Sequence, residues 1–182
     1  MVNHLEFMSG ESPTHGLHYW EPVVDGRLLR EILDASTDDP AGAVGDNVPV
    51  LVHSWPVGLP TDVFVLLGAL PPELADRIPI FICPACGDLG CGAITAQVEW
   101  TAETVTWRNF GWDVNDVIDE DDDDLRLPAP ELVFDRREYE AELRRFIATF
   151  DEVRDALPPR LQPSARADAA RATRRRRWWP LG

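Results

Sequence analysis

Apolar and polar residues alternate most clearly in the middle of the chain. Within residues 93–100, Ile94, Ala96, Val98 and Trp100 are apolar, with Thr95, Gln97 and Glu99 between them, and the pattern continues after a short turn over residues 104–110. Such alternation is typical of antiparallel strands with one buried and one solvent-facing side. The preceding run, about residues 78–83, is almost wholly apolar, as in a buried strand. We therefore expect an antiparallel sheet centred on a hairpin (78–83, 93–100 and 104–110), with a further strand near 48–54.

A helical pattern follows near the end of the chain, over residues 135–157. Apolar residues recur there at steps of three and four, which form one stripe on a helix: Tyr139, Leu143, Phe146, Phe150, Val153 and Leu157. Asp135 and Glu138 have the spacing of a capping box. We expect this amphipathic helix to pack on one face of the hairpin sheet, which gives an α+β fold. The shorter apolar run Val63–Leu70 fits either a helix or a buried strand.

The composition of the other segments predicts how the chain divides into a domain and flanking segments. Residues 1–16 are polar and irregular, which predicts a flexible N-terminal segment, and we expect residues 17–157 to form a single globular α+β domain. Residues 111–130 contain a run of acidic residues and are expected to be a solvated linker. Residues 158–182 are rich in Ala, Arg and Pro, so we expect a basic, disordered tail.

Charge is distributed unevenly between the body and the tail. The chain has a formal net charge of −15 and contains no lysine, a bias that a high-GC bacterial genome also produces. Residues 1–157 contain 10 Arg and 31 acidic residues, whereas residues 158–182 contain 7 Arg and one acidic residue. The body should therefore repel nucleic acid. It would suit a basic protein partner, such as a cationic toxin held by an immunity protein.

The sequence offers no sign of export or membrane insertion. Its first ten residues lack the apolar core of a secretory signal. The longest apolar runs are much shorter than the roughly 18–20 residues that a membrane span requires. We expect a cytoplasmic protein, in which three cysteines are more typical of metal ligands or reactive thiols than of disulfides. No pattern specifies the oligomeric state.

All three cysteines lie in one glycine-rich segment between two expected strands, CPACGDLGCG, as Cys83, Cys86 and Cys91. Two thiolates separated by two residues can chelate one tetrahedral metal, and CPxCG is the form of many zinc knuckles. The glycines after Cys86 give the chain the freedom to bring Cys91 back toward the other two. The spacing therefore predicts a metal site, with Zn²⁺ as the expected ion.

Three thiolates leave one position of a tetrahedral zinc site to be filled. His53, at the end of the expected strand 48–54, is the preferred fourth ligand. His15 and His18 in the N-terminal segment, Asp88 within the loop, and a water molecule are the alternatives. A histidine between Val52 and Ser54 is, however, more often a residue of the core or of its rim.

Other uses of the cysteines remain open. CPAC is similar to the CPxC motif of glutaredoxins, which suggests a thiol-dependent oxidoreductase using Cys83 and Cys86. An iron–sulfur cluster fits less well, because the plant-type spacing is reversed and a fourth cysteine is missing. Packed, unmetallated thiols are a further alternative. No nucleophile elbow, phosphate-binding loop or zinc-protease motif occurs. We therefore favour a non-enzymatic binding or accessory protein whose cysteine loop is a structural zinc staple.

Residues 78–145 resemble a family of small uncharacterised bacterial proteins. The resemblance lies in the Cys-Gly…Gly-Cys turn of CPACGDLGCG, the V-x-W-x-x-F strand of VTWRNFGW, and the Phe-Asp…Tyr helix start of VFDRREYEAEL. The family has no established activity, so the resemblance implies an arrangement of strand, loop and helix without assigning a function.

Overall fold

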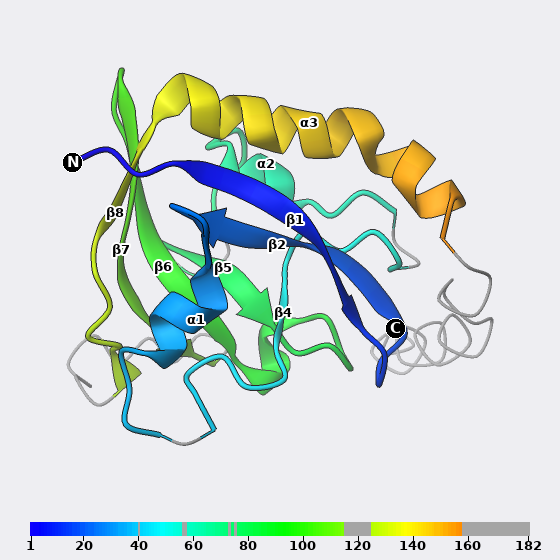
Figure 1. The fold of residues 1–182 in the computed structure, drawn as a ribbon, viewed down its shortest axis with the longest axis horizontal. Coiled ribbons are helices and arrows are strands. Elements are labelled where there is room, and N and C mark those ends of the chain that lie inside the picture. The colour runs from blue at the N-terminus through cyan, green and yellow to red at the C-terminus, as the bar shows by residue number, and fades with distance from the viewer. Residues whose placement is uncertain (40, 56–57, 73, 75, 115–124, 158–182) are drawn as a thin grey trace, which may run out of the picture.

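Eight strands and three α-helices are present in the part of the chain that the structure describes (Figure 1). The structure is a computed structural model and describes residues 1–182 except 40, 56–57, 73, 75, 115–124 and 158–182. The elements are β1 (Leu5–Ser12), β2 (Leu17–Val24), β3 (Arg27–Leu28), α1 (Leu29–Asp34), β4 (Val48–Pro49), α2 (Asp62–Leu66), β5 (Arg77–Ile82), the 3₁₀ turn η1 (Leu89–Cys91), β6 (Ala93–Trp100), β7 (Thr104–Asp113), β8 (Leu132–Asp135) and α3 (Arg136–Asp155).

The predicted hairpin is confirmed as the centre of a five-stranded antiparallel sheet in the order β4-β5-β6-β7-β8. Strand β7 is longer than the sequence predicts, because Gly111–Asp113, expected in a linker, pairs with the start of β6. Pro79 lies within β5, and the register shifts between Pro79 and Phe81 because proline cannot donate to the ladder. The run Val63–Leu70, whose sequence fits either a helix or a buried strand, begins within the short helix α2.

The N-terminal residues differ from the flexible segment expected over 1–16. Leu5–Ser12 forms β1, which pairs along its whole length with β2 in a second, three-stranded antiparallel sheet, β1-β2-β3. Leu5 and Phe7 are buried while Glu6 and Met8 are exposed. The burial of two apolar side chains on one face provides the hydrophobic driving force for this strand. Only two positions carry the alternation, which explains why it was missed.

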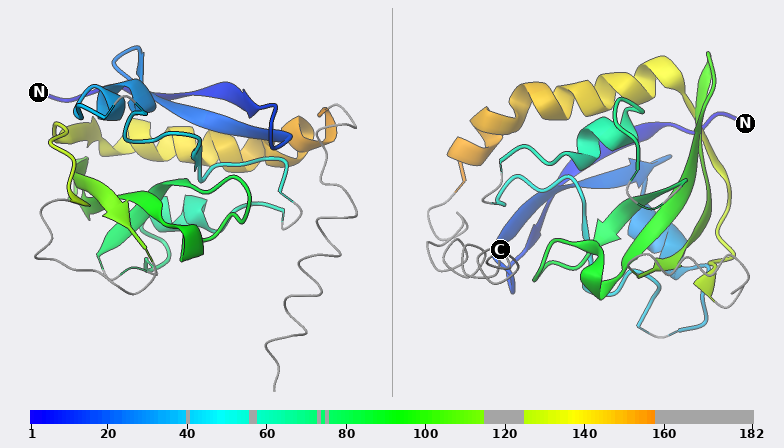
Figure 2. Two further views of the ribbon diagram at one scale, coloured as in Figure 1. Left: turned by 90° about the horizontal axis from the view of Figure 1, so that it is seen from below. Right: turned by 180° about the vertical axis from the view of Figure 1, so that it is seen from behind.

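The two sheets are joined at two places, so that together they curl around one core (Figure 2). At one, the Trp20 N–H donates to the carbonyl of Leu51 (2.9 Å) and the His53 N–H donates to the carbonyl of His18 (2.8 Å). At the other, the Asn3 N–H donates to the carbonyl of Val133 (2.6 Å). These bonds link β2 to the segment after β4, and the N-terminus to β8.

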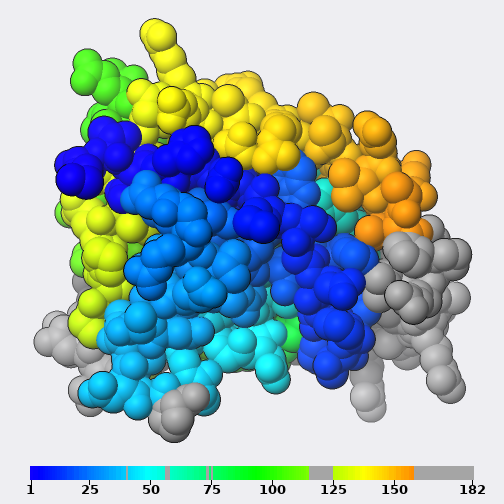
Figure 3. Space-filling view, viewed as in Figure 1, coloured from blue at the N-terminus to red at the C-terminus, as the bar shows by residue number. Residues whose placement is uncertain are grey.

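Helix α3 packs where the sequence predicted it, against β7 and β8, and also against β1 (Figures 1 and 3). The carboxylate of Asp135 accepts hydrogen bonds from the N–H groups of Arg137 (2.9 Å) and Glu138 (3.1 Å), which confirms the N-cap. The helix ends at Asp155, two residues earlier than expected. Its buried face consists of Tyr139, Leu143, Phe146 and Phe150. The helix therefore closes the core between the two sheets.

Candidate metal centre

The cysteine loop connects the central strands β5 and β6. Cys83 follows the last residue of β5, and Cys91 ends η1 just before β6 begins. Within the loop, the Gly87 N–H donates to the carbonyl of Cys83 (2.9 Å), and the carboxylate of Asp88 accepts from the Gly90 N–H (2.8 Å). These bonds fold the loop back on itself between the end of β5 and the start of β6, which brings the sulfurs of the three cysteines together.

The loop ends at Gly92 in a backbone conformation that suits only glycine. Its φ is +90°, in the region that L side chains rarely adopt. A Cβ at this position would lie 2.3 Å from Cζ2 of Trp112. Gly92 therefore lets the loop pass directly over the Trp112 ring as it enters β6.

The three cysteine sulfurs lie within 4.8 Å of one another. The sulfurs of Cys86 and Cys91 are 3.3 Å apart, and no disulfide joins any of the three. Zinc–thiolate bonds of about 2.3 Å in a tetrahedral site place two sulfurs about 3.8 Å apart. The spacing therefore matches three ligands of one ion with small side-chain adjustments, and Cys83, Cys86 and Cys91 can hold a metal.

The thiols of the cluster differ in acidity. Burial works to raise the pKa of Cys83, but hydrogen bonds from the N–H groups of Cys86 and Ala85 and from the other two thiols outweigh it. The pKa of Cys83 consequently lies below its ordinary value. Burial raises the pKa of Cys86 to about 12, and hydrogen bonding to Cys91 and Cys83 adds to the rise. Since a metal binds thiolates, its binding must displace protons from this cluster and weaken at low pH.

His53, the preferred fourth ligand from the sequence, is not part of this cluster. Its ring is buried between aromatic side chains, stacked on Phe150 (5.3 Å between centroids) and tilted against Phe146 (4.7 Å) and Trp20 (5.7 Å). Burial, together with the nearby His18, lowers the pKa of His53 to about 4. His53 is therefore a neutral residue of the core at neutral pH.

The other candidate side chains do not complete the site either. His15 is exposed at the turn after β1, and His18 lies in β2 with Glu11 opposite (3.9 Å). The carboxylate of Asp88 is used within the loop, on the Gly90 N–H. Among the described residues, no histidine or carboxylate joins the three sulfurs in one ligand group. A fourth ligand would therefore be water or a group that lies outside the residues described by the structure.

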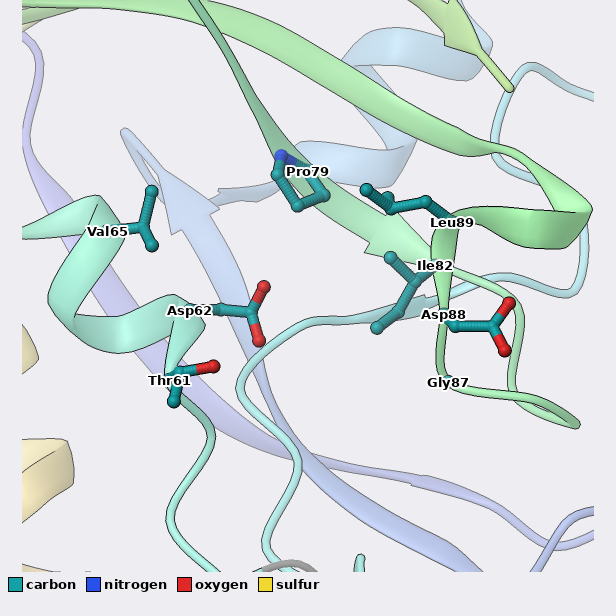
Figure 4. A pocket seen from close by; sticks show the side chains of 8 residues that line it. All are labelled: Thr61, Asp62, Val65, Pro79, Ile82, Gly87, Asp88 and Leu89. Carbon is teal, nitrogen blue, oxygen red and sulfur yellow. The ribbon is translucent and has the colours of Figure 1, made fainter. Parts of the chain in front are cut away.

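A cavity of about 250 Å³ lies beside the cysteine loop (Figure 4). Its lining comes from α2 and the residue before it, from β5 and from the loop: Thr61, Asp62, Val65, Pro79, Ile82, Gly87, Asp88 and Leu89. In Figure 4 the carboxylate of Asp88 turns away from Asp62, in keeping with its bond to Gly90. Because residues 87–89 stand between Cys86 and Cys91, one wall of the cavity belongs to the loop.

A buried charge network joins the strands on both sides of the loop, and no sequence pattern predicted it. Arg77 at the start of β5 donates from Nε to Oδ2 of Asp113 (2.7 Å) and from Nη2 to the carbonyl of Asn109 (2.6 Å). The hydroxyl of Thr95 also donates to Asp113, and Nη1 of Arg126 lies 3.1 Å from its Oδ1. The network ties β5, β6 and β7 together.

Asp113 is ionised within this network. Burial works to raise its pKa, but hydrogen bonds from Thr95 and Arg77, and the charges of Arg77 and Arg126, hold that pKa below its ordinary value. Asn109 adopts a left-handed conformation (φ 51°) near the register shift between β6 and β7, and its carbonyl accepts from Arg77. Because every charged group here has a partner, we regard the network as structural support for the strands that carry the loop.

The fold and the cluster together define an α+β protein of curled antiparallel sheets with a three-cysteine centre at a strand–strand corner. No family model matches the chain, and neither the curated proteins nor the solved structures contain a match. The resemblance to small bacterial proteins therefore stays a prediction. No helix in the described residues is long and apolar enough to cross a bilayer.

Proposed function

We propose that this chain is a non-enzymatic binding or accessory protein whose cysteine loop holds one zinc ion as a structural staple. The observation that carries the proposal is the convergence of three sulfurs, from Cys83, Cys86 and Cys91, within 4.8 Å. Soft thiolate ligands in a tetrahedral arrangement favour zinc over magnesium or calcium, which prefer oxygen.

A zinc ion here would join the two ends of the loop between β5 and β6. Structural zinc contributes on the order of 10 kcal/mol in small peptide sites. That amount is comparable with the whole stability of an ordinary domain, about 5–15 kcal/mol. The fourth position would hold water or a group from outside the described residues, because His53 is committed to the core and no other described histidine or carboxylate joins the three sulfurs.

The acidic surface supports a basic protein as the partner. The chain carries a net charge of −15, and the body is still more acidic than the whole, because the last 25 residues contain seven arginines and one acidic residue. A field of this sign attracts cationic surfaces and accelerates their association at low salt. An immunity-like role, in which the chain covers a cationic protein, fits this charge.

Native mass spectrometry of the freshly purified full chain tests the zinc proposal. We expect one zinc per chain in the unmodified protein and its loss in Cys86→Ser. His53→Leu serves as the matched control, because His53 lies outside the cluster, and this variant should keep its zinc. Unmodified protein that stays metal-free after incubation with one equivalent of zinc would overturn the proposal.

A thiol-dependent oxidoreductase using Cys83 and Cys86 is the second candidate. The lowered pKa of Cys83 favours it, since the thiolate is the reactive form. The idea predicts that Cys83 in metal-free protein is alkylated faster than free cysteine at neutral pH. Rates equal to that of free cysteine would remove this candidate and leave the zinc proposal untouched.

A further inference from the structure

We propose that Cys86 and Cys91 form a redox switch for the metal: a peroxide joins the two sulfurs in a disulfide, and the zinc ion is released. This inference rests on the proposed function, because it concerns the regulation of the same three sulfurs. The proposed disulfide differs from the one that the glutaredoxin-like CPxC motif suggests, which would join Cys86 to Cys83.

The geometry of the cluster points to this pair. The Sγ atoms of Cys86 and Cys91 are 3.3 Å apart. A disulfide bond is about 2.0 Å long, so the sulfurs need to approach by only about 1.3 Å. Four residues separate the two cysteines, and Gly87 and Gly90 among them give the segment backbone freedom. The bond can therefore close within the loop without moving β5 or β6.

Accessibility distinguishes the cysteines further. Cys91 is exposed, whereas Cys83 and Cys86 are half-buried. A peroxide arriving from solvent therefore meets Cys91 first, with the Cys86 sulfur beside it. An exposed cysteine next to a second, resolving cysteine is the usual arrangement of redox-sensing thiols.

The chemistry proceeds in two steps and uses one hydrogen peroxide. The Cys91 sulfur attacks one peroxide oxygen, the O–O bond breaks, and a sulfenic acid forms while the other oxygen leaves as water after taking up a proton. The Cys86 sulfur then attacks the Cys91 sulfur, the S–O bond breaks, and the hydroxyl leaves as a second water. Two thiols are oxidised by two electrons in total, and the peroxide is reduced to two waters.

Oxidation would leave the metal without its site. Zn²⁺ undergoes no redox change, and after the disulfide forms only the Cys83 thiolate remains of the three ligands. The residues between the two cysteines, Gly87–Leu89, also line the cavity beside α2. Closing the disulfide therefore changes the wall of this cavity at the same time as it releases the ion.

The test uses the zinc-loaded full chain and hydrogen peroxide. A colorimetric indicator follows zinc release, and peptide mapping by mass spectrometry locates the disulfide. We expect one zinc released for every two thiols lost, a Cys86–Cys91 disulfide, and recovery of zinc binding after reduction with dithiothreitol.

Three serine variants separate the possible pairings. Cys83→Ser should still form the disulfide under peroxide, whereas Cys86→Ser and Cys91→Ser should not. Circular dichroism verifies that each variant is folded, and the mapping of the unmodified protein stands even if a variant fails to fold.

The outcomes separate the switch from the proposed function. If the protein binds zinc but peroxide yields a Cys83–Cys86 disulfide, or only over-oxidised thiols, the switch is overturned and the zinc staple stands. If the protein binds no zinc at all, both proposals fall.

Discussion

Neutralising Asp113 should destabilise the fold strongly, because this residue balances a buried arginine. The side chains of Asp113 and Arg77 are only 3% and 4% exposed, and their charged atoms lie 2.7 Å apart. In Asp113→Asn the shape of the side chain is kept but its charge is lost. The buried guanidinium of Arg77 would then donate only to neutral acceptors, such as the Thr95 hydroxyl and the Asn109 carbonyl.

The expected cost follows from the burial of the pair. Removing one partner of a buried ion pair typically costs about 3–5 kcal/mol, since the remaining charge has lost its compensation. For a chain of this size each kcal/mol lowers the Tm by about 2–4 °C. We therefore expect the Tm of Asp113→Asn to fall by roughly 6–20 °C.

Glu99→Gln, which removes an ion pair between β6 and β7 of the same sheet, provides the matched control. Glu99 and Arg108 form an ion pair at 3.4 Å, but their side chains are 60% and 47% exposed. Exposed pairs contribute about 0–1 kcal/mol. Urea unfolding and thermal melts at neutral pH compare the two variants. If Asp113→Asn costs no more than Glu99→Gln, the network contributes no more than a surface pair and the reasoning is wrong.

Three further changes test the core, the loop and the helix. His53 has a pKa of about 4 in the fold and about 6.5 in the unfolded chain, so the free energy of unfolding should fall by about 3 kcal/mol between pH 6.5 and 4. Urea unfolding at the two pH values should show a smaller fall for His53→Leu than for the unmodified protein, and equal falls would contradict this prediction. The methyl group added in Gly92→Ala would clash with Trp112, so this variant should lose more stability than Gly26→Ala, where φ is also positive (+77°) but the space is open. Equal Tm values for the two variants would contradict the close approach of Gly92 to Trp112. Asp135→Ala should cost about 1 kcal/mol, and an unchanged urea midpoint would argue against the cap.

The sequence predicted the features that depend on local pattern. Alternation over β6 and β7 located the hairpin, and a capping residue with an apolar stripe located α3. The spacing of Cys83, Cys86 and Cys91 indicated that their sulfurs converge, which the structure shows. Each of these signals lies within a short stretch of chain.

Features that depend on distant pairing were missed. Asp113 stands beside an acidic stretch and looked like part of a linker, yet it is buried because β7 continues and Arg77 comes from another strand. The burial of Leu5 depends on pairing with Val24, nineteen residues away. A histidine between Val52 and Ser54 is more often a core or rim residue than a ligand, and the packing of Phe146 and Phe150 from α3 against His53 shows that it belongs to the core.

X-ray absorption at the zinc edge tests the central claim most directly, because it counts the sulfur atoms bound to the ion in the full chain. The account predicts three sulfurs at about 2.3 Å and one lighter ligand at about 2.0–2.2 Å. A shell with two sulfurs or fewer, or a shell made only of nitrogen and oxygen, would show that Cys83, Cys86 and Cys91 do not act together on one metal.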